Sequence, residues 1–168
     1  YYLLRLRETG NVTWLDLAAR AARSSLKAIP AEQNAGGLSL LAQVQFAAHD
    51  FASARDHAEQ LTRLDPRKGY PYLLLGDALT ELGDYEAAQS AFRQMERRGS
   101  ADVAARTRLA RMAALTGDNA RAERLYVEAL NLAVEAVPPS RETGAWCRWQ
   151  LGETAFGADI DRRVVHVV

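Results

Sequence analysis

Leucine, aspartate and alanine recur along this chain at one constant interval. The recurring positions are Leu41, Leu75 and Leu109, then Asp50, Asp84 and Asp118, and then Ala54, Ala88 and Ala122. Between them, apolar residues follow the three-to-four-residue spacing of amphipathic helices, interrupted by short polar corners. The pattern predicts three consecutive helix pairs, near residues 37–48 and 51–64, 71–82 and 85–98, and 103–115 and 119–136.

The residue after each recurring leucine is small: Ala42, Gly76 or Ala110. A small residue lets the neighbouring helix approach closely, so the second helix can pack its alanine and aromatic side chains there. At the corners, glycine permits the left-handed residue that ends a helix, and aspartate can accept hydrogen bonds from the free amides of the next one. We therefore expect hairpins that bury their apolar faces only by stacking on one another.

Residues 69–102 carry the fullest copy of the pattern. It reads Tyr72-x2-Leu75-Gly76-x2-Leu79, then Gly83-Asp84-Tyr85, then Ala88-x3-Phe92. This spacing, with a period of about 34 residues, resembles that of the tetratricopeptide repeat family. The resemblance implies an all-α fold, a right-handed α-solenoid (superhelix) of antiparallel helix pairs, with repeats at residues 35–68, 69–102 and 103–136.

The two ends of the chain depart from this period. Residues 1–34 predict a degenerate N-terminal repeat whose second helix runs from Trp14 to Ala28. Leu151-Gly152 follows Leu109-Ala110 by eight positions more than one period, which indicates an insertion. Residues 144–168 therefore predict an incomplete C-terminal repeat with a first helix near 144–156. For the tail after it, a frayed helix, an edge strand and a docked segment stay open.

Composition narrows the range of partners. The chain has 168 residues, of which 48% are hydrophobic and 25% charged, and its 21 Lys and Arg balance 21 Asp and Glu. Because there is no net charge to attract a polyanion, we expect no nucleic-acid partner. No apolar run approaches the roughly 20 residues of a spanning helix, so we expect no membrane span.

The sequence offers little material for catalysis. It has no glycine-rich phosphate loop and no pair of His or Cys at metal-ligand spacing. The one cysteine, Cys147, cannot form an intramolecular disulfide, and we interpret it as a half-buried packing residue. We expect no enzyme activity, no catalytic residue, no metal site and no cofactor.

The family resemblance implies a protein-protein interaction module, a scaffold or adaptor that binds a peptide or helix in the concave groove of its first helices. Gln43 is suited to bonding a peptide backbone, and Arg108 and Arg111, on one helix face, to holding a carboxylate. The alternative is that this face is only solvated surface. The groove candidates are Gln43, Tyr70, Leu74, Asp77, Arg108, Arg111, Trp149 and Gln150.

Two other functions remain open. One is a peptide- or ligand-sensing regulatory domain of a larger bacterial regulator. The other is a structural solenoid that self-associates into a homo-oligomer through its C-terminal end, where Trp146, Trp149 and Phe156 lie beside the broken repeat. We expect a cytoplasmic protein, or a periplasmic one if a leader precedes Tyr1, because the chain begins without methionine.

Overall fold

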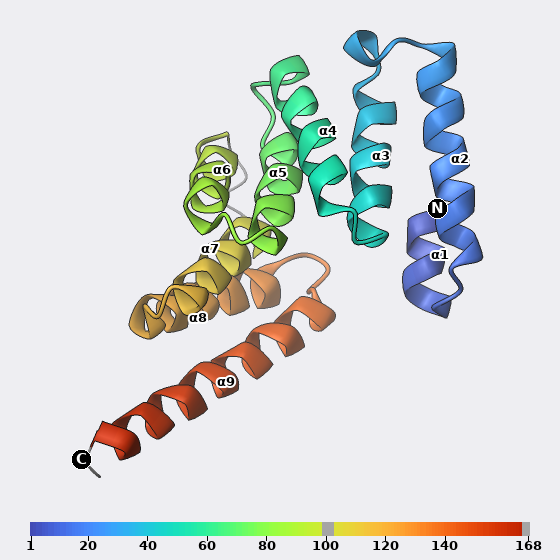
Figure 1. The fold of residues 1–168 in the computed structure, drawn as a ribbon. Coiled ribbons are helices and arrows are strands. Elements are labelled where there is room, and N and C mark those ends of the chain that lie inside the picture. Colours follow the sequence, from blue (N-terminus) through green and yellow to red (C-terminus); the bar gives the residue numbers. More distant parts are fainter. Residues whose placement is uncertain (99–102, 166–168) are drawn as a thin grey trace. The chain divides into compact units, whose positions relative to one another are not determined.

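The computed structural model describes the backbone of residues 1–98 and 103–165, and the side chains of these ranges as far as Phe156. Within them the regular structure is entirely helical, which confirms the expected all-α fold (Figure 1). The chain divides into two compact units, Tyr1–Arg98 and Gly99–Val168. None of the described helices combines the length and the apolar composition that crossing a bilayer requires.

The first unit is a series of helices in which each packs against the next along the chain, and α3 also contacts α5 (Figure 1). Its helices are α1 (Tyr2–Thr9), α2 (Thr13–Ala28), the short 3-10 helix η1 (Ala31–Gln33), α3 (Ala35–Ala47), α4 (Phe51–Leu64), α5 (Tyr70–Glu81) and α6 (Tyr85–Arg97). The helix pairs α3–α4 and α5–α6 begin and end within a few residues of the predicted ones.

The second unit contains α7 (Val103–Leu115), α8 (Asn119–Glu135) and α9 (Arg141–Val165). The middle helix, α8, packs against both of the others. The eight inserted residues lengthen α8, which has 17 residues against 14 in α4 and 13 in α6, and form the loop before α9. That loop contains a cis peptide bond between Val137 and Pro138.

The corners of the three hairpins share one backbone geometry. His49, Gly83 and Gly117 have φ angles of 60°, 81° and 82°, in the left-handed region. The aspartate after each of them caps the following helix, because its carboxylate accepts a hydrogen bond from a backbone amide three residues on, at 3.1–3.2 Å. The predicted aspartate cap is therefore confirmed in all three copies, and the predicted left-handed glycine in two, since His49 takes its place in the first.

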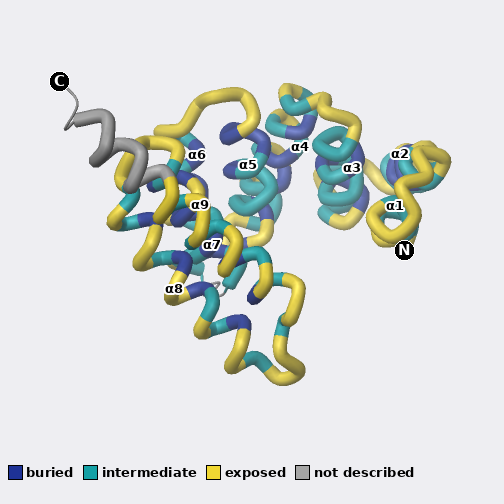
Figure 2. The backbone as a smooth tube through the Cα atoms, turned by 90° about the horizontal axis from the view of Figure 1, so that it is seen from below, coloured by how far each residue is buried: buried dark blue, intermediate teal, exposed yellow. Residues whose placement is uncertain are grey.

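The small residues lie at the centre of the helix packing, as predicted. Ala42 is 2% exposed and Ala110 is wholly buried. A Cβ added at Gly76 would lie less than 3.0 Å from three carbons of the Phe92 ring, so the ring occupies the space that a side chain would need. Figure 2 shows buried positions along the sides of the helices and exposed ones along the loops.

The N-terminal pair α1–α2 forms despite its weak match to the repeat. Gly10, with a φ angle of 66°, ends α1 after only 8 residues. A small core joins α1 and α2 to α3, in which Ala18, Ala19 and Val44 are buried beneath partly exposed apolar side chains. The degenerate sequence at the start of the chain thus still packs as a helical hairpin.

At the other end, α9 has no corner where the next hairpin turn would fall. It continues as one helix of 25 residues to Val165. Of the three conformations left open for the tail, the backbone is helical as far as Val165, and residues 166–168 lie outside the described range.

Candidate functional site

A pocket of about 490 Å³ lies within the second unit, among α7, α8 and α9. α7 contributes an arginine and two apolar residues, α8 contributes a tyrosine whose ring forms the base of the pocket, and α9 contributes a tryptophan and a glutamine. The lining residues are Arg111, Ala114, Leu115, Tyr126, Trp146 and Gln150.

Tyr126 forms the floor of this pocket and is wholly buried. It lies one period after Phe92 and packs in a core with Ala110, Ala113 and Ala122. The half-buried Trp146 meets its ring edge-on, with centroids 5.7 Å apart and an interplanar angle of 75°. Edge-to-face pairs of this kind are favoured by the charge distribution of the rings, by about 0.5–1.5 kcal/mol, so the contact stabilises the indole of Trp146 as one wall of the pocket.

The hydroxyl of Tyr126 donates a hydrogen bond to Oε1 of Gln150 over 3.3 Å. Burial raises the pKa of Tyr126 to about 12, and the nearby Arg111 cation opposes the rise only partly. Tyr126 is therefore a neutral donor at physiological pH. This bond engages the amide oxygen of Gln150, which leaves the amide nitrogen as the group suited to donate to a carbonyl oxygen.

Of the four candidates expected in this part of the chain, Arg111 and Gln150 line the pocket, and Arg108 and Trp149 do not. Arg111 is exposed at the rim. The guanidinium of Arg108 turns back along α7 and donates from Nη1 to the carbonyl of Ala104 at 3.3 Å. Trp149 is 59% exposed.

The pocket also contains residues that were not among the groove candidates: Ala114, Leu115, Tyr126 and Trp146. A repeat-based signal could have found Tyr126, since it lies one full period after Phe92. The sequence indicates Trp146 only as part of an aromatic cluster at the C-terminal end. The insertion before α9 breaks the period, so the face that α9 turns toward α8 could not be inferred from spacing.

The other four candidates lie in the first unit, on α3 and α5. Gln43 is half-buried and donates from Nε2 to the carbonyl of Ser39 at 3.2 Å. Asp77 lies one period later, so it occupies the same position on the neighbouring first helix, and α3 contacts α5. Leu74 is half-buried on α5, while Tyr70, at the start of α5, is 43% exposed.

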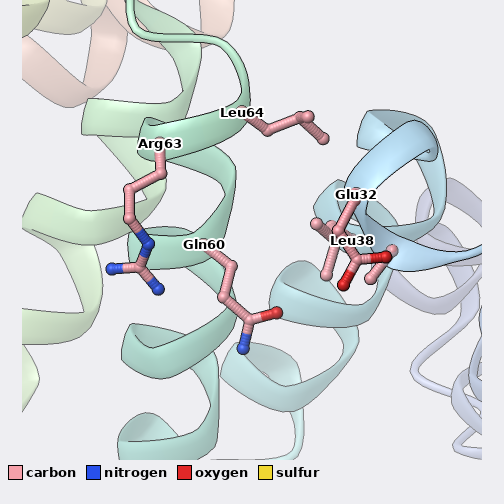
Figure 3. A pocket seen from close by; sticks show the side chains of 6 residues that line it. Glu32, Leu38, Gln60, Arg63 and Leu64 are labelled. Carbon is pink, nitrogen blue, oxygen red and sulfur yellow. The ribbon is translucent and has the colours of Figure 1, made fainter.

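Two pockets lie among the described residues of the first unit, and neither is lined by any of these four candidates. One, of about 400 Å³, lies between the end of α4 and the segment from η1 to α3 (Figure 3). Figure 3 shows Gln60 and Arg63 on α4, across from Glu32 and Leu38. The other, of about 480 Å³, is formed by α4, α5 and α6, with Leu75 and Leu79 among its apolar residues.

The described residues contain no group of three or more His, Cys, Asp or Glu side chains placed to hold a metal ion. The single cysteine is buried more deeply than expected: Cys147 is 0% exposed within α9. Burial raises the pKa of its thiol, and the neighbouring Arg148 only partly offsets this. Cys147 is therefore a packing residue of the second unit.

Solved structures with similar folds include helical proteins of type III secretion systems. The translocator chaperone SycD of Yersinia enterocolitica superposes with a TM-score of 0.69 at 19% identity, over 74% of this chain and 94% of that one. PcrH of Pseudomonas aeruginosa, in complex with the chaperone-binding region of PopD, gives 0.65 at 22% identity, over 72% and 90%. A thermophilic TPR protein from Thermus thermophilus gives 0.69 at 17% identity, over 92% and 87%.

No curated protein sequence matches the chain. The model of the tetratricopeptide repeat, however, matches residues 39–88 and 73–140, which together make up more than half of it. The helix pairs, the corner geometry and the close helix contacts described above are those expected from the repeat. The chain belongs to the tetratricopeptide repeat family, and its fold is an all-α solenoid of helix pairs.

Proposed function

We propose that this chain is a non-catalytic protein-interaction module that holds a peptide or helix of a partner protein along its first helices. The observation that carries the proposal is the pocket among α7, α8 and α9, where Arg111 and Gln150 flank an aromatic floor. A cation, an amide and an apolar cavity together match a peptide segment with an apolar side chain next to an acidic group or a carbonyl oxygen.

Each wall of the pocket has a distinct role in this proposal. Trp146 and Leu115 exclude water from an apolar side chain, which is the main source of affinity. Gln150, whose oxygen Tyr126 already engages, donates from its amide nitrogen to a backbone carbonyl. Arg111, exposed at the rim, attracts an acidic residue and fixes the direction of the peptide.

The structural neighbours support a peptide as the ligand. One of them, PcrH, is solved with the chaperone-binding region of PopD, and another, SycD, with a peptide of the translocator YopD. These ligands belong to those proteins, and the likeness to this chain is one of fold. The support is that the same fold holds partner segments in those complexes.

The remaining candidates are proposed contacts within each unit. We infer that Gln43, Tyr70, Leu74 and Asp77 contact a peptide in the first unit, and that Arg108 and Trp149 contact one near the pocket in the second. The repeats proposed to carry these residues are 35–68, 69–102 and 103–136, between a degenerate unit at 1–34 and an incomplete one at 144–168.

The test is to select binders from a random peptide library displayed on phage and to titrate a labelled synthetic copy of an enriched peptide by fluorescence anisotropy. We expect Arg111→Glu to weaken binding at least about tenfold, or about 1.4 kcal/mol, because it reverses the charge at the rim. Gln150→Ala should weaken it by a smaller factor, since it removes one neutral hydrogen bond.

The matched control is Arg124→Glu, which makes the same change of charge at an exposed position on α8 outside the pocket lining. It should bind like the wild type. Equal affinity of all four proteins would place the peptide elsewhere. A library that yields no binder above background would remove the proposed function itself.

A further inference from the structure

Four exposed residues form a stripe along α9, on the side that does not pack against α8. They are spaced four, three and four residues apart, which keeps them on one face of a helix. Trp149 is 59% exposed and Phe156 is 67% exposed. The residues of the stripe are Ala145, Trp149, Gly152 and Phe156.

Gly152 marks an unfilled packing position in this stripe. In α5 the equivalent glycine, Gly76, is covered by the ring of Phe92 from the next helix. In α7 the equivalent Ala110 packs in one core with Tyr126, again from the next helix. α9 runs on as one helix past the point where α5 and α7 end, and among the described residues no atom lies within 4 Å of a Cβ placed at Gly152.

We propose that the α9 stripe binds the α9 stripe of a second copy of this chain, with the two helices antiparallel. In this pair, Trp149 of each chain packs on Gly152 of the other, and Phe156 packs on Ala145. The contact repeats between two chains the packing of a large ring on a small residue that Phe92 and Gly76 make within one hairpin.

The order of large and small residues favours a second copy as the occupant. Trp149 and Gly152 have the same midpoint in the sequence as Ala145 and Phe156, between Gln150 and Leu151. Both pairings therefore form at once in a single antiparallel register, and the two-fold axis produces each of them twice. In a parallel pair each ring would face a ring and each glycine a glycine. The rings would then clash, and the small residues would leave unfilled space between the helices.

The charge of the chain is compatible with this self-association. With 21 basic and 21 acidic residues there is no net repulsion for two copies to overcome. The aromatic pair supplies the apolar area, and the small residues let the two helix backbones approach. The pocket itself is lined by other residues of α7, α8 and α9, and Trp149, proposed above to contact the peptide near the pocket, is the one residue that both surfaces share.

The test measures mass by light scattering across a dilution series. We expect the wild type to fall on dilution from twice 18.5 kDa to 18.5 kDa. Gly152→Gln should remain at 18.5 kDa throughout, with its helicity preserved, because it fills the small position without touching the chain's own fold. The matched control Val134→Gln removes an apolar side chain that is 52% exposed on α8, outside the stripe, and should pair like the wild type.

A compensating exchange tests the register. The double variant Trp149→Gly with Gly152→Trp again places one large residue opposite one small residue in each pairing, so we expect it to recover the dimer that Gly152→Gln loses. A wild type that stays at the mass of one chain at every concentration overturns the proposal and leaves the stripe to a helix of a different protein. A Gly152→Gln variant that dimerises as tightly as the wild type overturns it too.

Discussion

The ring of Phe92 lies over Gly76 so closely that even one additional carbon at Gly76 would overlap it. Phe92 is 1% exposed, and at this point of α5 only a residue without a side chain fits against its ring. The contact sets the distance between α5 and α6. The first unit therefore depends on the absence of a side chain at Gly76 as much as on the presence of the ring.

We expect Gly76→Leu to lower the free energy of unfolding by about 1–3 kcal/mol, because overpacking forces the two helices apart. Urea denaturation followed by circular dichroism measures it. The control is Gly36→Ala on α3, where the nearest side-chain atom is 3.9 Å from the added carbon, so stability should hold or rise by up to about 1 kcal/mol. Equal midpoints for Gly76→Leu and the wild type would show that the helices can separate at no cost.

At the hairpin corners, introducing a glycine and removing one should change the stability in opposite directions. His49 adopts a left-handed φ of 60°, a conformation that costs a residue with a side chain about 1–2 kcal/mol and glycine almost nothing. After the entropy cost of glycine, His49→Gly should stabilise the protein by about 0.5–1 kcal/mol. Gly83→Ala, at a φ of 81°, should destabilise it by about 1 kcal/mol. Melting temperatures that move in the same direction would contradict this account of the corners.

Because of Tyr126, the free energy of unfolding should fall as the pH rises into the alkaline range. The pKa of Tyr126 is raised from 10 to about 12, so the folded chain keeps a proton that the unfolded chain releases between these values. The contribution of this tightly held proton to the free energy of unfolding is complete below pH 10 and is lost as the pH rises toward 12. We expect the wild type to lose about 1–3 kcal/mol more than Tyr126→Phe over this range.

The measurement is urea denaturation of both proteins at about pH 9 and about pH 11. The control Tyr85→Phe changes an exposed tyrosine at the start of α6 and should follow the wild type. If Tyr126→Phe shows the same alkaline loss as the wild type, the buried hydroxyl is not its source.

Cys147 should resist thiol reagents in the native protein. It is fully buried, and burial raises the pKa of its thiol, so little of the reactive thiolate forms near neutral pH. We expect modification by a chromogenic disulfide reagent only as fast as the second unit opens, and at once in denaturant. An Ala155→Cys variant, exposed on the same helix, should react immediately in the native state at its second thiol. Rapid native labelling of the wild type would contradict the burial of Cys147.

The constant period of the sequence predicted the hairpins because the same three demands recur in each copy: a small residue, a corner and an aspartate cap. Asp50, Asp84 and Asp118 accept the same capping hydrogen bond, from the amide three residues on, at nearly the same length. Local chemistry of this kind is carried by a few adjacent residues. It can therefore be inferred without knowing which helices pack against each other.

The C-terminal third was harder to predict for the opposite reason. The tail is rich in valine, which favours strands, yet the backbone of α9 is helical to Val165, since propensity is a weak guide when no strand partner is available. The pocket depends on how α9 lies on α8 after the insertion. Arg111 and Gln150 were among the candidates, whereas Trp146 and Tyr126 became part of the site only through that packing.

The hydroxyl of Tyr126 also limits the exchange of repeats. Phe92 occupies the equivalent place one copy earlier and needs only apolar neighbours, whereas Tyr126 needs an acceptor, which Gln150 on α9 supplies. Moving the third repeat to an earlier place would bury a donor beside a helix that lacks this amide. One oxygen atom thus makes this copy specific for the place directly before α9, and the order of the helix pairs depends on the sequence as well as their shape.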